Sequence, residues 1–162
     1  MVQNRAVIII GSSGDEEFAR PIRSTLKKLG LPCELRVASA HKTPSRLLEI
    51  LEEYEHSGDR IVYITVAGRS NALSGFVDSN TRYPVIACPP QSDKFGYVDI
   101  FSSLRMPTGV SPLVILEPES AALAAAKILA LSDADVCERV LSYQKGVRDK
   151  VDQDDEKLRK SE

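Results

Sequence analysis

Five short strand-like runs, most of them continuously apolar, recur along the chain. They occupy residues 6–10, 33–37, 61–66, 85–87 and 113–116. Continuous rather than alternating apolarity is typical of strands that are covered on both faces. The first run is too short for the apolar core of a signal peptide or for a membrane span, and a glycine ends it. We therefore expect five buried strands and a cytoplasmic protein.

Most of these runs are separated by segments in which apolar residues recur at helical spacing. In residues 16–29 the apolar positions are Phe18, Ile22, Leu26 and Leu29. In residues 44–56 they are Leu47, Leu48, Leu51 and Tyr54. Strand and helix alternate, so the sheet should be parallel and the fold class α/β, with helices packed on a central sheet.

The second half of the chain contains three less regular segments. Residues 88–110 carry three prolines and two glycines, which predicts a long irregular connection of the kind that often serves function. Residues 119–131 are rich in alanine and predict a buried helix or a subunit contact. From about residue 134 we expect one or two charged helices, with a charged helical C-terminal tail from about residue 146 that frays at its end.

Composition narrows the class of protein. The chain has 162 residues, of which 43% are hydrophobic and 27% charged, as expected for one ordinary globular domain spanning residues 1–162. A net charge of −2 gives no general attraction to nucleic acid or to anionic membranes, so neither is an expected partner. The three cysteines form no CxxC pair and no even-numbered disulfide framework, although a nucleophilic Cys88 stays open as an alternative.

The first candidate for chemistry follows the first run, at Gly11-Ser12-Ser13-Gly14-Asp15. In an open parallel sheet, ligands bind at the carboxyl ends of the strands, where the start of a helix offers free N–H groups to a phosphate. Glycines and hydroxyls suit that task. A simple turn with Asp15 as a helix N-cap explains the same residues.

The second candidate follows the second run, at Ser39-Ala40-His41-Lys42-Thr43-Pro44. His41 can accept and donate protons near neutral pH, and Lys42 can add positive charge for a phosphate. We expect Thr43 to cap the next helix, with Pro44 at its first position. The alternative is that His41 is a turn histidine without a chemical role, and His56 is expected to be merely solvated.

The third candidate follows the third run and covers residues 67–75. Small residues there let the backbone approach a ligand, and Arg69 can bind a carboxylate. A plain helix start capped by Ser70 is the alternative. Three successive strand ends thus offer phosphate donors, a titratable base and a carboxylate ligand.

In this order and spacing, the three segments resemble the signatures of the PurE family, the aminoimidazole ribonucleotide carboxylases and mutases. Those signatures are Gly-Ser-x-Ser-Asp, Ser-Ala-His-Arg/Lys and an Ala-Gly-rich loop, and the resemblance covers essentially the whole chain. It implies a flavodoxin-like three-layer αβα sandwich. It also implies a homo-oligomer, commonly an octamer and otherwise a tetramer, with no cofactor and no metal, and with a nucleotide and CO2 as the small-molecule partners.

The resemblance also assigns roles. His41 would be the general acid/base, Ser12, Ser13 and Lys42 would hold the phosphate, and Asp15 would accept hydrogen bonds from the ribose. The carboxyl group would bind at Gly68, Arg69 and Ser70. The remaining substrate-binding positions that it implies are Gly11, Ser39, Ala40, Ala67, Asn71 and Leu73.

Two features separate the branches of the family. The mutase branch usually has Arg after the motif histidine and a second histidine at the position of Ala72, whereas this chain has Lys42 and Ala72. Ala67-Gly68-Arg69-Ser70-Asn71, Ala87-Cys88-Pro89-Pro90 and Ser102-Ser103-Leu104-Arg105-Met106-Pro107 are similar to the branch that carboxylates directly with CO2. One departure is Gly14, which stands where the family has its second loop serine.

Three other readings compete with direct carboxylation. The mutase shares fold and base but takes its carboxyl group from N5-carboxyaminoimidazole ribonucleotide. A related carboxylase could act on a pyridine dinucleotide, although its usual extra domain is absent here. A non-catalytic flavodoxin-like binding or signalling module would be compatible with the fold alone.

Overall fold

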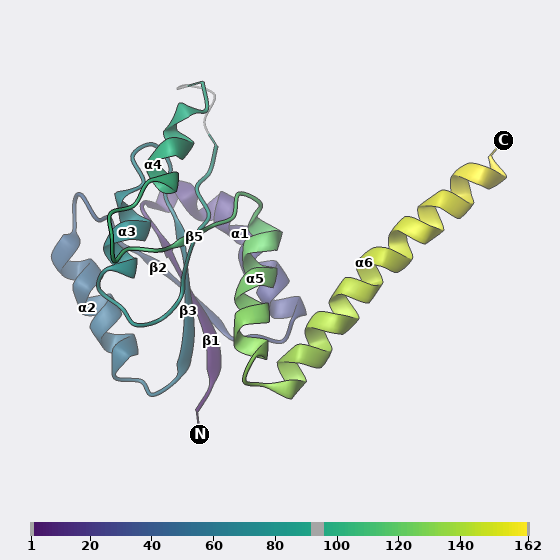
Figure 1. Cartoon of the computed structure of the whole chain (residues 1–162), viewed down its shortest axis with the longest axis horizontal. Coiled ribbons are helices and arrows are strands. Elements are labelled where there is room, and N and C mark those ends of the chain that lie inside the picture. The colour runs from purple at the N-terminus through teal and green to yellow at the C-terminus, as the bar shows by residue number, and fades with distance from the viewer. Residues whose placement is uncertain (1, 92–95, 162) are drawn as a thin grey trace.

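A five-stranded parallel sheet forms the middle layer of the molecule (Figure 1). The computed structural model describes residues 2–91 and 96–161. The strands are β1 Asn4–Ile10, β2 Cys33–Val37, β3 Arg60–Val66, β4 Val85–Ala87 and β5 Leu113–Val114. Their order is β2-β1-β3-β4-β5, and every neighbouring pair is parallel. The predicted α/β flavodoxin-like sandwich is therefore confirmed.

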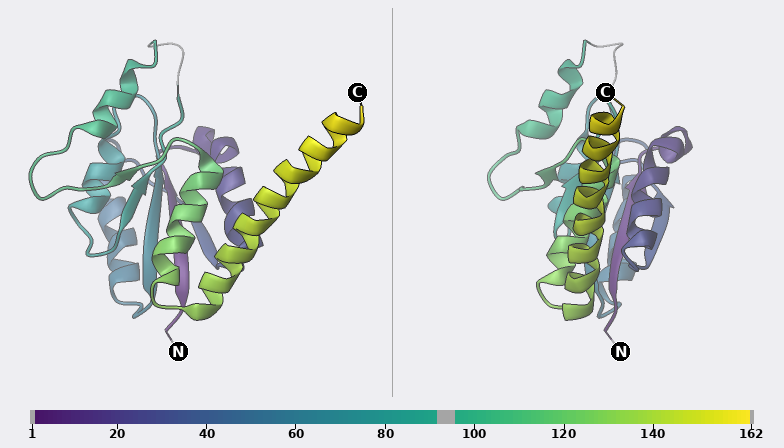
Figure 2. Two further views of the ribbon diagram at one scale, coloured as in Figure 1. Left: turned by 45° about the vertical axis from the view of Figure 1, so that its right-hand side comes forward. Right: turned by 90° about the vertical axis from the view of Figure 1, so that its right-hand side faces the viewer.

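Helices cover both faces of this sheet (Figures 1 and 2). One face carries α1 Glu16–Lys28, α5 Pro118–Ala130 and the first turns of α6 Ala134–Lys160. The opposite face carries α2 Pro44–Glu55 and α3 Ala72–Asp78. No helix within residues 2–91 and 96–161 is long and apolar enough to cross a lipid bilayer.

Apolar side chains form one core on each face of the sheet. Ile8 and Ile10 of β1 pack with Leu26 of α1 on one face, whereas Val7 and Ile9 contribute to the core beneath α2 on the other. Residues 6–10 are all at most 1% exposed, which explains why the first run is apolar without alternation. Burying each isoleucine side chain contributes about 1.5–3 kcal/mol of favourable transfer free energy.

The alanine-rich segment is an internal helix. Its alanines at positions 121, 122, 125 and 126 are fully buried against the sheet and α1. The small side chains let α5 lie close to its neighbours, so the buried-helix alternative is the one that the structure supports.

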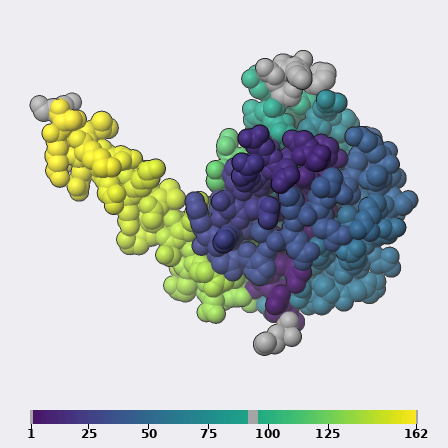
Figure 3. Space-filling model, turned by 180° about the vertical axis from the view of Figure 1, so that it is seen from behind, coloured from purple at the N-terminus to yellow at the C-terminus, as the bar shows by residue number. Residues whose placement is uncertain are grey.

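The strand and helix boundaries differ little from the predicted ones, with three exceptions. β5 ends at Val114 rather than residue 116, although the N–H of Ile115 still donates to the Ala87 carbonyl at 2.9 Å. The last segment is a single helix where one or two were predicted, and it continues through residue 146 to Lys160, so the charged tail is part of this helix. Figure 3 shows the C-terminal half of α6 standing clear of the rest of the chain.

The third exception lies in the connection predicted to be irregular, residues 88–110. It contains a 3₁₀ turn, η3 Val98–Ile100, followed by the short helix α4 Phe101–Leu104. Both lie before Pro107 and Gly109. The prolines and glycines of this connection had led to the prediction of an irregular segment. Residues 92–95 of this connection lie outside the described residues.

The strand order places the three candidate loops together. The chain leaves β1 toward β2 on one side and returns to β3 on the other, so the order reverses between β1 and β3. Such a switch point opens a crevice at the carboxyl ends of the strands. The Gly11 N–H donates to the Val66 carbonyl at 2.9 Å, and the Ala38 N–H donates to the Ile10 carbonyl at 3.0 Å. The loops after β1, β2 and β3 therefore start side by side.

Candidate active site

An open cleft of about 500 Å³ lies at this switch point. Its lining comes from the loops after β1, β2 and β3 and from the start of α3. The lining residues are Gly11, Ser12, Asp15, Ser39, Ala40, His41, Lys42, Ala67, Gly68, Arg69, Ser70 and Leu73. The sequence analysis singled out all of these residues, and the fold gathers them around one space.

The loop after β1 is closed by Asp15. Its Oδ2 atom accepts hydrogen bonds from the Ser12 N–H at 3.1 Å and the Ser12 hydroxyl at 3.0 Å. The Asp15 N–H returns a bond to the Ser12 carbonyl at 3.1 Å. A short 3₁₀ turn, η1 Ser13–Asp15, then leads into α1 with Asp15 at the N-cap position. Asp15 thus serves the turn through Oδ2, and it is also one of the residues that line the cleft.

The loop after β2 is a tight turn that holds His41 at the surface. The Thr43 N–H donates to the Ser39 carbonyl at 2.9 Å, and the Ser39 N–H donates to Thr43 Oγ1 at 2.9 Å. The Lys42 N–H also reaches Ser39 Oγ at 3.3 Å. Thr43 is the N-cap residue and Pro44 begins α2, as predicted, but the Thr43 hydroxyl closes this turn instead of capping the helix. His41 and Lys42 are exposed, so both are accessible to a ligand in the cleft.

The loop after β3 has an unusual backbone conformation. Arg69 has φ of 59°, in the left-handed region that costs a residue with a side chain about 1–2 kcal/mol. Next to it, a Cβ atom placed on Gly68 would lie 3.4 Å from both Pro90 Cγ and the Pro90 carbonyl oxygen. Strained backbone of this kind concentrates at functional sites, where surrounding contacts hold it. The Arg69 side chain is exposed and lines the cleft.

Two predicted binding residues lie outside the cleft lining. Ser13 is exposed on the first turn before α1. Asn71 is only 4% exposed and is the N-cap of α3, so the helix start given above as an alternative is present, with Asn71 rather than Ser70 as its cap. Asn71 Oδ1 accepts from the Ser74 N–H at 3.3 Å, and its Nδ2 donates to Ser103 Oγ at 2.8 Å. Its side chain is therefore engaged in the fold.

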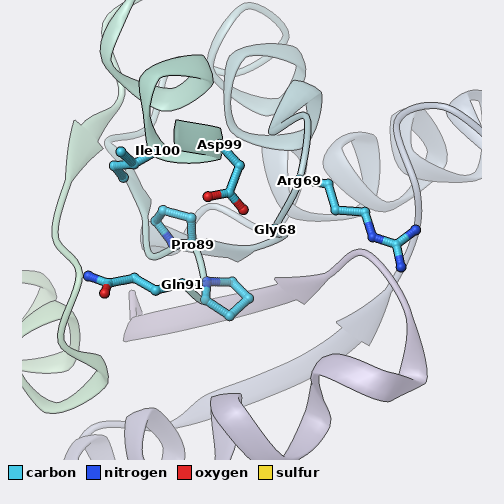
Figure 4. Close-up of a pocket in the computed structure, with 7 residues that line it drawn as sticks. Gly68, Arg69, Pro89, Gln91, Asp99 and Ile100 are labelled. Carbon is cyan, nitrogen blue, oxygen red and sulfur yellow. The ribbon is translucent and has the colours of Figure 1, made fainter. Parts of the chain in front are cut away.

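The connection after β4 adds residues that the sequence did not assign to the site. Pro89, Pro90 and Gln91 follow β4 and, with Asp99 and Ile100, enclose a cavity of about 10 Å³ behind Gly68 and Arg69. Figure 4 shows the Asp99 carboxylate directed toward Pro89 and the Gly68 turn, while the Arg69 side chain extends away from Asp99. The residues of this connection thus lie against the β3 loop and share a cavity with Gly68 and Arg69.

The charges around the cleft favour an anionic ligand. Among the lining residues that the structure describes, Lys42 and Arg69 are the cations and Asp15 is the one carboxylate. Within the described ranges, no three histidine, cysteine, aspartate or glutamate side chains lie close enough together to share a metal ion. The cleft itself offers a basic, hydroxyl-rich lining with one imidazole.

The other two ionisable candidates lie outside this chemistry. Burial raises the pKa of the Cys88 thiol to about 12, and the nearby carboxylates of Glu117 and Glu119 add to the shift. A thiol with so high a pKa is a poor nucleophile, which argues against the Cys88 alternative. His56 is exposed at the end of α2, where its Nδ1 contacts the Glu52 carbonyl at 2.9 Å, as expected for a solvated helix end.

The sequence is similar to those of known proteins. The family model for AIR carboxylase matches residues 5–150. A phosphoribosylaminoimidazole carboxylase of Archaeoglobus fulgidus is 56% identical over 155 residues, covering 96% of this chain and 85% of the relative. A protein of the same name from Treponema denticola is 48% identical over 154 residues, covering 95% and 97%.

The fold is also similar to that of a solved structure. The crystal structure of Treponema denticola PurE superposes with a TM-score of 0.92 at 48% identity, covering 94% of this chain and 97% of that one. The chain thus belongs to the AIR carboxylase (PurE) family of purine biosynthesis.

Proposed function

We propose that this protein carboxylates 5-aminoimidazole ribonucleotide directly with CO2, giving 4-carboxy-5-aminoimidazole ribonucleotide, without metal, biotin or ATP. The observation that carries the proposal is the cleft at the switch point, where His41 shares one lining with Lys42 and the Gly68–Ser70 turn. This arrangement supplies a proton acceptor, a phosphate-binding cation and a carboxylate-binding turn around one ligand-sized space.

The choice of CO2 over the mutase reaction has separate support. Ala72 occupies the position at which the mutase branch usually has its second histidine, and Lys42 replaces the arginine that follows the motif histidine there. Both relatives described above are named carboxylases. The chain therefore departs from the mutase pattern at Lys42, which lines the cleft, and at Ala72, which precedes the lining residue Leu73.

The chemistry needs few groups from the protein. Ring carbon 4 is nucleophilic because the exocyclic amine feeds it electron density, so it attacks the carbon of CO2. A carbon–carbon bond forms, one C=O π pair moves onto oxygen, and carbon 4 becomes tetrahedral. His41 then removes the hydrogen of carbon 4 as a proton, and the C–H pair returns to the ring to restore aromaticity.

Arg69 and the neighbouring N–H groups of the β3 loop would act on the developing carboxylate. Neutral CO2 gains little from a guanidinium, whereas the carboxylate that forms in the reaction gains a charge-assisted hydrogen bond. An interaction that strengthens along the reaction coordinate lowers the barrier rather than merely holding the substrate. Lys42 and the Ser12 loop would hold the phosphate, and Asp15 the ribose.

Replacement of His41 tests the assigned base. We expect His41→Asn to lose at least about 100-fold in turnover, because proton transfer by a positioned side chain is typically worth 10²–10⁴. Since His41 is exposed, nucleotide affinity measured by calorimetry should stay within a few-fold of wild type. His56→Asn is the matched control, because that histidine is exposed and is not among the residues that line the cleft. Near-wild-type turnover of His41→Asn would contradict the role.

The donor of the carboxyl group is tested with the mutase substrate. N5-carboxyaminoimidazole ribonucleotide should be converted only as fast as it decomposes to aminoimidazole ribonucleotide and CO2. Removing CO2 from solution should then stop product formation. Conversion that continues in CO2-free buffer would assign the chain to the mutase branch.

We also propose that the protein is a homo-oligomer. The distal half of α6 stands clear of the chain and exposes Val147, Val151 and Leu158 on one side. An apolar stripe on a projecting helix is normally covered by a partner. Light scattering coupled to size exclusion should give a mass of several chains, and a monomer at micromolar concentration would contradict this proposal.

A further inference from the structure

Two consecutive serines on α4 face the loop after β3. The Asn71 N–H donates to Ser102 Oγ at 3.0 Å, and the Ser102 hydroxyl lies 3.2 Å from the Arg69 carbonyl and 2.7 Å from the Asp99 carbonyl. Ser103 Oγ accepts from Asn71 Nδ2 at 2.8 Å. The Ser102 hydroxyl thus contacts the backbone on both sides of Ser70, and the Ser103 hydroxyl contacts the side chain of Asn71. We call Ser102 and Ser103 the serine bracket.

The hydrogen bond between Asn71 and Ser103 is buried, so water cannot readily replace either partner. Asn71 is 4% exposed and Ser103 is 2% exposed, so losing their hydrogen bond would leave a buried amide donor without a partner. Asn71 Oδ1 is fixed by the Ser74 N–H at the start of α3. The position of α4 is therefore coupled to the start of α3 and, through the chain, to Arg69.

The bracket holds a conformation that the loop would otherwise resist. Arg69 lies in the left-handed region, which residues with a side chain adopt only when neighbouring contacts impose it. Ser102 contacts the carbonyl of this residue and the N–H two residues later. Those contacts fix the orientation of the two peptide groups that flank Ser70.

Ser102 is not among the residues that line the cleft. It lines a separate open groove between α3 and the connection after α4. Any effect of Ser102 on a ligand in the cleft must therefore pass through residues 69–71. This placement distinguishes it from the residues that line the cleft.

We propose that Ser102 and Ser103 are positioning residues that set the carboxylate-binding shape of the Gly68–Asn71 turn. The inference rests on the proposed function, because it takes this turn as the part of the site that binds the carboxyl group. It assigns a role to the Ser102-Ser103 pair, which the reaction mechanism leaves unused. Loss of a hydroxyl from the serine bracket should therefore weaken binding of the carboxylated nucleotide and leave binding of the uncarboxylated one nearly unchanged.

Calorimetric binding of the two nucleotides to the whole 162-residue chain tests the proposal without depending on turnover. In Ser102→Ala, we expect affinity for 4-carboxy-5-aminoimidazole ribonucleotide to fall roughly 3- to 10-fold, the effect of one lost hydrogen bond. Affinity for 5-aminoimidazole ribonucleotide should change less than about 2-fold. Ser102→Thr keeps the hydroxyl and should restore the carboxylate preference. Ser111→Ala, an exposed serine on the same connection, is the matched control.

A second variant guards against a trivial loss of fold. Ser103→Ala should show the same selective loss, and its melting temperature identifies any general destabilisation. If both serine variants bind the two nucleotides in the wild-type ratio, the serine bracket is not a positioning device, while the proposed function stands. If wild-type protein binds neither nucleotide, the proposed function fails and this inference with it.

Discussion

The left-handed backbone of Arg69 predicts that glycine at this position gives a more stable folded chain than alanine does, although both substitutions lower activity. Arg69→Gly removes the guanidinium from the cleft, and it also removes the Cβ that makes φ of 59° costly. Arg69→Ala removes the same guanidinium but keeps the Cβ. The pair therefore separates the conformational cost of this residue from its chemical role.

The expected magnitudes follow from two opposing terms. The left-handed conformation costs a residue with a Cβ about 1–2 kcal/mol, and glycine avoids that cost. Glycine loses about 0.5–1 kcal/mol through its greater freedom in the unfolded chain. The Gly variant should thus be more stable than the Ala variant by about 0.5–1 kcal/mol, which for a domain of this size raises Tm by about 1–4 °C.

Activity should follow the guanidinium instead. Loss of one donor to a developing oxyanion typically costs 10²–10³ in kcat, and both variants lose it. Melting temperatures should be compared at one protein concentration, because assembly stabilises the folded state. A Gly variant less stable than the Ala variant would refute the strain argument. Near-wild-type turnover of either variant would refute the role of Arg69.

Three further predictions concern the scaffold. Leu26 is fully buried and Leu131 is 89% exposed. Leu26→Ala should therefore lower the free energy of unfolding, measured in urea, by about 2–5 kcal/mol, and Leu131→Ala by less than about 0.5 kcal/mol. Equal losses would contradict the packing described for α1. Asn71→Ala removes the α3 cap and the bond to the buried Ser103 hydroxyl, and should cost about 1–3 kcal/mol by the same method, whereas an unchanged urea midpoint would show that the cap is dispensable. Because the pKa of Cys88 is raised from 9.0 to about 12 in the folded chain, the unfolded chain ionises first, so Cys88 contributes stability that is lost as pH rises from about 9 to 12. Cys88→Ala should flatten that part of the stability profile, and a slope identical to wild type would contradict the shift.

Much of the fold could be predicted because its strands are buried on both faces. The run at residues 6–10 is apolar at every position since β1 lies in the middle of the sheet, between β2 and β3. The edge strand β2 is less apolar, with Glu34 and Val37 exposed, yet its place between two helical segments still identified it. Alternation of elements was the stronger signal there.

The short helices α3 and α4 could not be predicted in the same way. They contain seven and four residues, which is too little for a helical period to be recognised. A cap residue at Asn71 was the available signal for α3, but an asparagine in a glycine-rich loop fits a binding role equally well. Its partner Ser103 is 32 residues away, and only the folded chain shows that contact.

The sequence predicted which loops form the site, but not the backbone conformations and contacts within them. Parallel strands bring their carboxyl ends to one edge, so the loops of Ser12, His41 and Arg69 were expected to meet. The left-handed Arg69 and the support from Asp99 and Ser102 depend on contacts more than 29 residues apart, which no local pattern encodes.

The most direct test of direct carboxylation is to mix purified protein with 5-aminoimidazole ribonucleotide in buffer without ATP, with and without bicarbonate, and to follow the ultraviolet absorbance of the carboxylated product. The account predicts product formation that depends on bicarbonate and is absent without enzyme. No product at any bicarbonate concentration, from protein that binds the nucleotide, would contradict it.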